Sequence, residues 1–377
     1  MSFVETDAQV ALQEAVAEVV DKVVVPVATA VPEGGKLSAD DLRRVYKALT
    51  PLGYLGSTIS KDFGGAGMSY VDYGLLLEAL ARGPVVLGEV VPPRTINYLG
   101  DTEQKGRWLP KLFSGDWIST AAITEPQAGS DMRGFKTTAV LQGDGYVVNG
   151  QKRWIKLGGV SDLMTLMVVD AQGGLSRLVL ERAVSPWESR EHDAVGIKNV
   201  SFAELTFKDV RVPRANLLGD AGAGGEQFHR GIESSRVFVG IQAVGLARHA
   251  LDIATRYAKE RVAFGRPIGK FQGIQMALAD AATRLQAARL LCLNALSILD
   301  AGRRAPSDVS MAKLFAVETA IRTCQVAMES MGAFGLSVEA GVERCWRDCC
   351  MLTAIDGTAN VQRLIIGREL LGMPAFV

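Results

Sequence analysis

The spacing of apolar residues divides the chain into three parts, of which the first is helical. In residues 1–117, apolar positions recur every three or four residues, as on one face of an amphipathic helix. Ser38 suits the N-cap of the second such stretch. We expect the first stretch to end before Pro26, because proline removes a backbone donor and clashes with the preceding turn. The expected helices cover residues 8–25, 39–49, 70–82 and 101–112.

From residue 118 to 218 the pattern changes to that of short strands. Apolar and β-branched runs alternate there with Gly, Asp and Asn, which is typical of strands joined by tight turns. Residues 142–145 and 149–150 have the composition of hairpin turns. We therefore predict a compact β barrel or sandwich. The expected strands cover residues 137–141, 145–150, 163–169, 175–180 and 205–207.

The helical pattern returns in residues 219–377. Long stretches rich in Ala and Leu, one opened by Pro306 and closed by Gly332, predict an antiparallel four-helix bundle with apolar surface left for other subunits. The order of elements gives an α+β fold with an N-terminal helical domain (1–117), a middle β domain (118–218) and a C-terminal bundle (219–377). The expected bundle helices cover residues 239–261, 274–299, 309–331 and 360–371.

The composition is that of an ordinary globular protein. Of the 377 residues, 48% are hydrophobic and 22% are charged, and 41 Lys and Arg balance 41 Asp and Glu. Without a basic excess, we do not expect nucleic-acid binding. The first residues lack the pattern of a signal peptide, and no run of 18 apolar residues occurs. We expect a cytoplasmic protein that does not cross a membrane.

The cysteines and histidines do not predict a metal site. The five cysteines lie in helical sequence without a Cys-x-x-Cys pair, which indicates reduced thiols. Cys345 and Cys349 are one helical turn apart, but none of the three histidines is close to them in sequence.

One turn at the head of the β domain is a candidate for binding a cofactor. Residues 122–131 follow a short apolar approach with Thr, Pro, Gly, Ser and Asp, which offer hydroxyls and free backbone N–H groups at the end of a strand. An ordinary strand-to-turn junction explains this segment equally well on its own.

Together with this turn, the order of segments resembles the acyl-CoA dehydrogenase family of flavoproteins. The matches run in sequence order over nearly the whole chain, and their combination is far more specific than any one of them. Asp356-Gly357-Thr358 lies where the family carries its catalytic Glu-Gly-Thr. The matching segments are Ala122–Asp131, Asn149–Ile155, Gly158–Asp162, Phe207–Pro213, Asn216–Gly219, Arg261–Gly269, Phe271–Gln272, Asp356–Thr358 and Gln362–Arg363.

The resemblance implies an FAD cofactor held between subunits, and it assigns roles to individual residues. Asp356 would remove the α-proton of an acyl thioester while the β-hydrogen leaves as hydride to the flavin, and its backbone N–H would polarise the thioester carbonyl. Ser130, Arg236 and Gly357 would contact the substrate. FAD would be contacted by Ile123, Thr124, Ser130, Trp154, Lys156, Arg261, Phe264, Gln272, Glu329, Gly332, Thr358 and Asn360, of which Arg261, Phe264 and Gln272 would reach it from the adjacent subunit.

Several assignments have a simpler alternative. Trp154 could instead be a core aromatic of the β domain, and Arg261 a solvated charge at a helix end. Lys156 stands where the family has Thr or Ser; its charge would favour reduced, anionic flavin, or it would point into solvent and do nothing. Glu329 and Asn360 also depart from the common residues at their positions.

The base position departs most. Aspartate is shorter than the family's glutamate by one carbon, about 1.5 Å, and misplacing a base by about 1 Å costs on the order of a hundredfold in rate. Either Asp356 is then a working base that the substrate or the backbone has shifted to meet, or the chain is a weak or non-dehydrogenating relative. A base near residue 235 would need a carboxylate, but Ser235 stands there, and Glu233 would face another side of a helix.

We thus expect an FAD-dependent acyl thioester dehydrogenase. It would act on acyl-CoA or an acyl-carrier protein, form a homo-oligomer (dimer or tetramer) or a heterotetramer, and pass electrons to an electron-transfer flavoprotein. The alternatives are a flavin monooxygenase of the same superfamily and a non-catalytic subunit of a heteromeric dehydrogenase.

Overall fold

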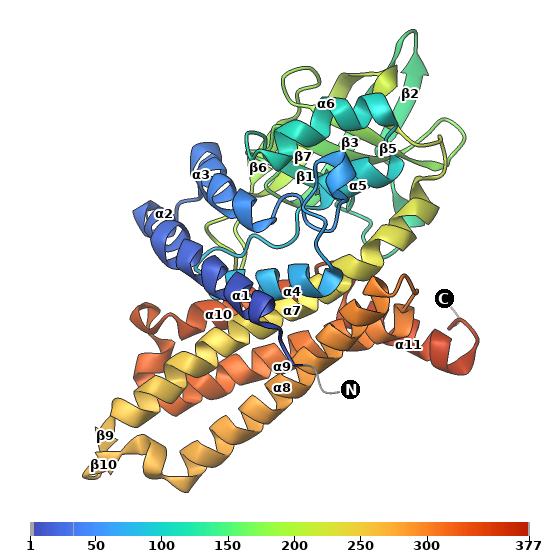
Figure 1. The fold of residues 1–377 in the computed structure, drawn as a ribbon. Helices are drawn as coiled ribbons and strands as arrows, with labels where there is room; N and C mark the ends of the chain where they lie inside the picture. Colours follow the sequence, from blue (N-terminus) through green and yellow to red (C-terminus); the bar gives the residue numbers. More distant parts are fainter. Residues whose placement is uncertain (1–3, 33, 376–377) are drawn as a thin grey trace.

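The computed structural model describes residues 4–32 and 34–375, without the side chains of residues 226, 227, 229 and 230. Figure 1 shows a β sheet at one end of the molecule and a long helical bundle at the other, with the N-terminal helices beside both. One long helix leaves the sheet and runs the length of the bundle. The predicted α+β class is confirmed.

The N-terminal helices agree with the sequence pattern except at Pro26 and over Val91–Leu99, a helix that the pattern did not predict. Ser38 caps α3, and its side chain accepts a hydrogen bond from the Asp41 amide, as expected. The first helix does not end before Pro26: a π-helical segment, Val20–Val24, leads directly into α2, whose first turn holds the proline. The wider π turn accommodates the ring and its missing donor. The helices are α1 (Asp7–Val19), α2 (Val25–Ala30), α3 (Ala39–Leu49), α4 (Tyr70–Leu80), α5 (Val91–Leu99) and α6 (Thr102–Phe113).

The β domain is one mixed sheet of eight strands within the described residues. The strand order is β6-β7-β3-β2-β4-β5-β8, with β1 parallel to β4. Buried apolar side chains from its strands form the core of this domain, among them Val148, Leu166, Leu178 and Leu205. The strands are β1 (Ser119–Ala122), β2 (Thr138–Gln142), β3 (Gly145–Lys156), β4 (Leu163–Val169), β5 (Leu175–Glu181), β6 (Glu188–Glu191), β7 (Phe202–Pro213) and β8 (Leu217–Leu218).

One of the two predicted hairpin turns is wrong. Residues 142–145 do join β2 to β3, where Gln142 pairs with Gly145. Residues 149–150 lie inside β3, at a shift of register against β7. Gly150 has a φ of 142°, and a Cβ there would lie 2.6 Å from the Thr137 Cα, so the glycine serves a bulge and a close approach.

The C-terminal part is a bundle built around α7, which packs against α4, α8, α9 and α10. Its helices are longer than the pattern predicted, and α10 was not predicted as a separate element. The elements are α7 (Gly224–Glu260), the hairpin β9 (Val262–Ala263) and β10 (Arg266–Pro267), α8 (Gln272–Asp300), α9 (Pro306–Met331), α10 (Val342–Leu352) and α11 (Ala359–Leu371).

One stretch of α7, Gly231–Glu260, is long and apolar enough to cross a membrane by length and composition. In this structure, 72% of its most apolar window is buried inside the molecule. Its apolar surface is therefore the centre of the bundle.

Gly245→Ala is expected to destabilise the packing of α7 on α4. A Cβ at Gly245 would lie 2.2 Å from the backbone oxygen of Glu78, so one of the two helices must move, at a cost of about 1–3 kcal/mol. The thermal midpoint of unfolding measures this. Gly106→Ala in α6 is the matched control, since nothing lies within 4 Å of its added Cβ and the helix gains propensity. An equal midpoint for both variants would contradict this account.

Candidate active site

Asp356 lies in a tight turn between α10 and α11 that is held from three sides. Its φ of 55° is unusual for a residue with a side chain. Arg236 of α7 donates from Nε to the Asp356 backbone oxygen at 3.2 Å. The Lys313 ammonium of α9 contacts the backbone oxygens of Ile355 and Gly357. Gln362 of α11 donates to the Asp356 and Gly357 oxygens at 3.2 and 3.0 Å, so the turn has little freedom to move.

The Asp356 side chain is half-buried and lies among positively charged groups. Burial raises its pKa, while the charges of Lys313, Arg236, Arg94 and Lys156 oppose this rise. Burial in turn lowers the pKa of Lys313 to about 8, which the Asp356 charge resists. A carboxyl whose pKa is raised is a stronger base than an ordinary aspartate, provided that it ionises at working pH.

Trp154 forms an exposed aromatic surface on β3 and is not a core residue. Its side chain is 48% exposed and its φ is 68°. The indole stacks on Phe202 with 5.6 Å between ring centroids, and the Arg153 guanidinium lies 4.4 Å from its ring centre. The alternative of a buried packing aromatic is therefore wrong, because these neighbours support the ring from the protein side and leave a flat area free.

The turn after β1 lies directly beside this tryptophan. The Arg153 amide donates to the Thr124 backbone oxygen at 3.0 Å, and the Thr124 hydroxyl donates to the Arg153 oxygen at 2.6 Å. Two of the sequence segments that carried the resemblance are thus brought together. Ile123 is half-buried near them, and Ser130 is exposed farther along the same turn.

A buried ion pair that the sequence analysis missed supports that turn. The side chains of Lys152 and Glu125 are 0% and 2% exposed, and their charged atoms are 2.8 Å apart. Lys152 also donates to the Ile123 oxygen at 2.7 Å, and Glu125 accepts from the amides of Lys136 and Thr137. Burial alone would raise the pKa of Glu125, but Lys152 and the two amides lower it to about 2.

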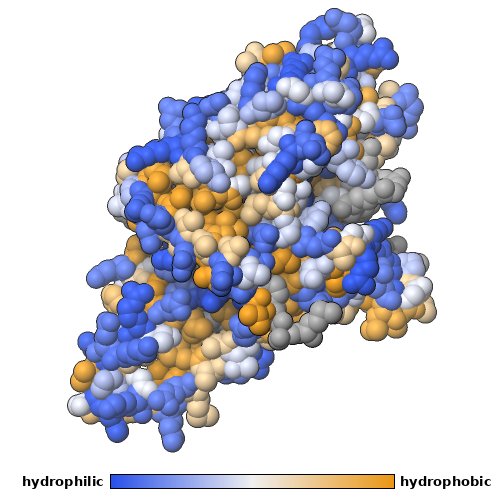
Figure 2. Space-filling view, in the orientation of Figure 1, coloured by the Kyte–Doolittle hydropathy of each residue, from blue (hydrophilic) through white to orange (hydrophobic). Residues whose placement is uncertain are grey.

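A second group of predicted residues lies far along the bundle. Arg261, Phe264, Glu329 and Gly332 line a pocket of about 800 Å³ between the β9–β10 hairpin and the end of α9. Phe264 is 93% exposed with a φ of 50°, and Gln272 is exposed next to the pocket at the start of α8. In Figure 2 the lower end of the molecule, where the hairpin lies, is mainly hydrophilic, with scattered apolar residues exposed among the hydrophilic ones.

The remaining predicted residues lie near the Asp356 turn. Thr358 caps α11, and its hydroxyl accepts a bond from the Val361 amide. Asn360 accepts from Arg363 at 3.3 Å and is exposed. Lys156 does not point into solvent: its ammonium contacts the Leu87 backbone oxygen, and burial lowers its pKa to about 8 against the charges of Asp356 and Glu89.

Glu89 and Arg94 also belong to this cluster, although the sequence analysis did not name them. Arg94 Nε lies 2.6 Å from Glu89 Oε1, and both side chains are largely buried. The sequence does contain a signal for these two residues: Glu89 lies inside the largely apolar run 85–93, and Arg94 follows it directly. A charged residue in such a run is unusual unless it is paired or functional.

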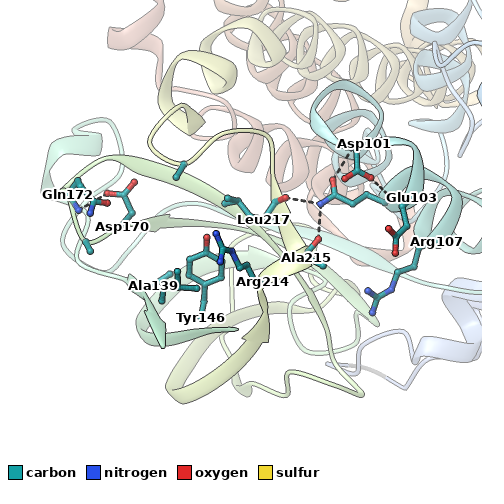
Figure 3. Close-up of a pocket in the computed structure, with 14 residues that line it drawn as sticks. Asp101, Glu103, Arg107, Ala139, Tyr146, Asp170, Gln172, Arg214, Ala215 and Leu217 are labelled. Atoms are coloured by element: carbon teal, nitrogen blue, oxygen red, sulfur yellow. Dashed lines mark hydrogen bonds between the residues drawn. The ribbon is translucent and has the colours of Figure 1, made fainter. Parts of the chain in front are cut away.

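A separate pocket of about 520 Å³ lies between α6 and the β sheet, away from the predicted site residues, none of which lines it (Figure 3). Gln104 donates there to the backbone oxygens of Ala215 and Leu217, both at 2.8 Å. These bonds connect an N-terminal helix to the end of the β domain. The pocket lining includes Asp101, Glu103, Arg107, Tyr146, Asp170 and Arg214.

Known proteins match this chain over nearly all of its length. Models of the acyl-CoA dehydrogenase N-terminal, middle and C-terminal domains match residues 6–116, 120–210 and 222–371. The probable acyl-CoA dehydrogenase YngJ of Bacillus subtilis (strain 168) is 34% identical over 387 residues, which cover 98% of this chain and 100% of that protein. This chain belongs to the acyl-CoA dehydrogenase family. The family predicted from the sequence is confirmed.

Solved structures of acyl-CoA dehydrogenases share the complete fold. The acyl-CoA dehydrogenase from Geobacillus kaustophilus has a TM-score of 0.91 at 30% identity, covering 98% of this chain and 100% of that one. A glutaryl-CoA dehydrogenase from Mycobacterium smegmatis in complex with FADH2 has a TM-score of 0.90 at 26% identity, covering 99% and 97%. Acyl-CoA dehydrogenases are FAD-dependent oxidoreductases, so the predicted enzyme class is confirmed, while the roles of individual residues stay predictions.

Proposed function

We propose that this acyl-CoA dehydrogenase family member introduces an α,β-double bond into an acyl thioester, with Asp356 as the base. The observation that carries the proposal is the Asp356 turn. Arg236, Lys313 and Gln362 fix its backbone, and its half-buried side chain lies among cations. A base held this firmly in a shielded position is what abstraction of a weakly acidic α-proton requires.

The protein groups around Asp356 have distinct tasks in this reaction. The carboxylate takes the proton from the α-carbon, and the nearby positive charges favour its ionised form. The Asp356 amide would donate to the thioester oxygen as negative charge develops there. Arg236 and Lys313 act through the backbone of the turn and are positioning residues.

The Trp154 surface and the Arg261–Phe264 pocket fit an FAD shared between subunits. Exposed Trp154, beside the Thr124 turn, suits the flat ring system, and the Arg261–Phe264 pocket suits a phosphate group next to apolar surface. When bound, FAD would supply the acceptor for the β-hydride. Trp154 and the Arg261–Phe264 pocket lie in distant parts of the folded chain. We therefore propose that the hairpin of one subunit reaches the cofactor held by its neighbour.

The proposal extends to partners and to domain organisation. Exposed Val262, Phe264, Met276 and Met311 on the hairpin, α8 and α9 are suited to contacts between copies in a dimer or tetramer. An electron-transfer flavoprotein is the proposed electron acceptor. We also propose domain limits at residues 117/118 and 218/219, where the hydrophobic period changes.

The test is to mix the FAD-loaded protein, without oxygen, with a panel of acyl-CoA and acyl-carrier thioesters and to follow loss of the oxidised flavin spectrum. At least one thioester is expected to bleach the flavin. If none does while dithionite still reduces it, the proposed function is wrong. Rapid reoxidation by oxygen with an oxygenated flavin spectrum would indicate the monooxygenase alternative instead.

Arg261→Met is expected to weaken FAD retention about ten- to a hundredfold, because one charge-assisted contact to phosphate is worth about 1.5–3 kcal/mol. Equilibrium dialysis of FAD measures the effect, and analytical ultracentrifugation reports the subunit number. Arg284→Met is the matched control, since that exposed arginine of α8 pairs only with Asp280 in the described structure. Unchanged retention in Arg261→Met would remove this residue from the proposed FAD site.

A further inference from the structure

The acyl chain of a thioester whose α-carbon lies at Asp356 must extend among the charged groups near that residue. The carboxyl interacts electrostatically with Lys313, Arg236, Arg94 and Lys156, and Glu89 interacts with it in turn. Lys156 lies two residues after Trp154 on β3, so the same cluster borders the proposed flavin surface. The acyl chain of a bound thioester therefore meets a strongly polar environment in this protein.

The far side of the cluster is built around Arg94 on α5. Its guanidinium pairs with Glu89 at 2.6 Å and donates to the hydroxyls of Ser234 and Ser235 on α7 at 2.6 and 3.1 Å. Ser235 is adjacent to Arg236, which holds the Asp356 turn. One turn of α7 thus connects the Glu89–Arg94 pair to the base.

The cations in this cluster already have protein partners, whereas Glu89 does not use its full capacity. Lys156 contacts Leu87, Lys313 contacts the turn, and Arg94 contacts two serines. The Glu89 side chain is only 6% exposed, and its two named contacts are Arg94, 2.6 Å from Oε1, and the Ser235 hydroxyl, which lowers the pKa of the carboxyl; neither is a well-directed hydrogen bond within the described residues. A carboxylate can accept more hydrogen bonds than these two neighbours supply, and unused acceptor capacity in a buried group is costly unless a ligand supplies the donor.

We propose that Glu89 accepts a hydrogen bond from a donor on the acyl chain, a hydroxyl or an ammonium group, and so selects polar acyl thioesters over plain alkyl ones. The inference rests on the proposed function, which puts the thioester at Asp356. Arg94 is its positioning residue, because it holds the Glu89 carboxyl in place through the ion pair. Polar recognition discriminates strongly, since an analogue without the donor leaves acceptor capacity of the buried carboxyl unused.

The test compares pentanoyl-CoA with its terminally hydroxylated and terminally aminated counterparts on the FAD-loaded enzyme. Flavin bleaching gives kcat and KM for each, and calorimetry with the unreactive thioether analogues gives affinity without turnover. One of the two polar compounds is expected to exceed pentanoyl-CoA about ten- to a hundredfold in kcat/KM, mainly through KM. The better of the two identifies the donor as hydroxyl or ammonium.

Two variants assign the preference to this residue. Glu89→Leu is expected to abolish it, and Glu89→Gln, which keeps the shape if the leucine variant does not fold, is expected to reduce it. Glu78→Gln is the matched control: this buried carboxylate pairs with Arg289 and Arg248 and is not among the groups acting on Asp356. If the parent enzyme binds the unsubstituted pentanoyl thioether as tightly as both polar thioethers, or more tightly, the inference is overturned.

The two proposals fail in different ways. If no thioester of any kind bleaches the flavin, the proposed dehydrogenation is wrong, while the thioether affinities still decide on Glu89. If all three thioesters bleach it with equal kcat/KM, the dehydrogenation stands and the inference about Glu89 is wrong.

Discussion

Replacing Asp356 by Asn is expected to slow thioester-dependent flavin reduction by about a hundredfold to ten-thousandfold, the usual contribution of a general base. The amide has nearly the same shape but cannot accept the α-proton. The backbone contacts of Arg236, Lys313 and Gln362 to the turn do not involve the side chain, so the turn is expected to persist. Stopped-flow measurement of the reductive half-reaction, with the best thioester of the panel, checks the result.

Asp356→Glu and dithionite reduction are the controls for this variant. Glutamate keeps the carboxylate but moves it by about 1.5 Å, so the rate is expected to lie between those of the parent and the Asn variant. Dithionite is expected to reduce the flavin of all three proteins equally. An Asn variant as fast as the parent would show that Asp356 is not the base.

Lys152→Met is expected to destabilise the β domain by about 3–5 kcal/mol, because it leaves the Glu125 carboxylate buried without its counter-charge. The turn that carries Thr124 loses its support at the same time, since Lys152 also binds the Ile123 oxygen. Urea unfolding followed by far-UV circular dichroism measures the change. Lys208→Met removes the exposed Lys208–Glu188 pair on the same sheet and is expected to change little. Equal loss in both variants would contradict the role of the buried pair.

The same ion pair predicts how stability depends on pH. The pKa of Glu125 is about 2 in the folded protein against 4.5 as the ordinary value, so unfolding is accompanied by proton uptake between these values. This contribution is fully present above about pH 4.5 and is lost as the pH falls toward 2. The acid transition of Lys152→Met, in which this pKa moves upward, is therefore expected to begin at a higher pH than that of the parent.

The sequence predicted the elements whose information is local. Ser38 and the three-to-four-residue spacing after it specify α3, and the run 163–169 specifies β4, because capping and periodicity act over a few residues. Two positions differ from the predicted pattern, and the reason for each is visible only in the folded structure. Pro26 was absorbed by a π turn, and Gly150 serves a bulge against β7 that no neighbour in sequence reveals.

The candidate site was predictable only where a segment is recognisable by itself. The turns carrying Thr124 and Asp356 could be identified from their residues, and so could the hairpin around Phe264. Lys313 could not be assigned in this way, since it is a single charge in helical sequence, and the charges of Glu89 and Arg94 at an apolar run show only that they are unusual, without giving a role. Their importance comes from neighbours that are more than a hundred residues away for Arg94 and about 40 for Lys313.

The sequence by itself therefore determined the order of helical and β regions with most of the longer elements, the family, and the identity of the residue at the base position. Only the tertiary structure decided what surrounds that residue. Burial raises the pKa of Asp356 against the opposing effect of nearby cations, and folding also leaves Trp154 exposed and places the Glu89–Arg94 ion pair in the same cluster. These quantities depend on distance in space and on access of water, which folding creates and which no local pattern of residues specifies.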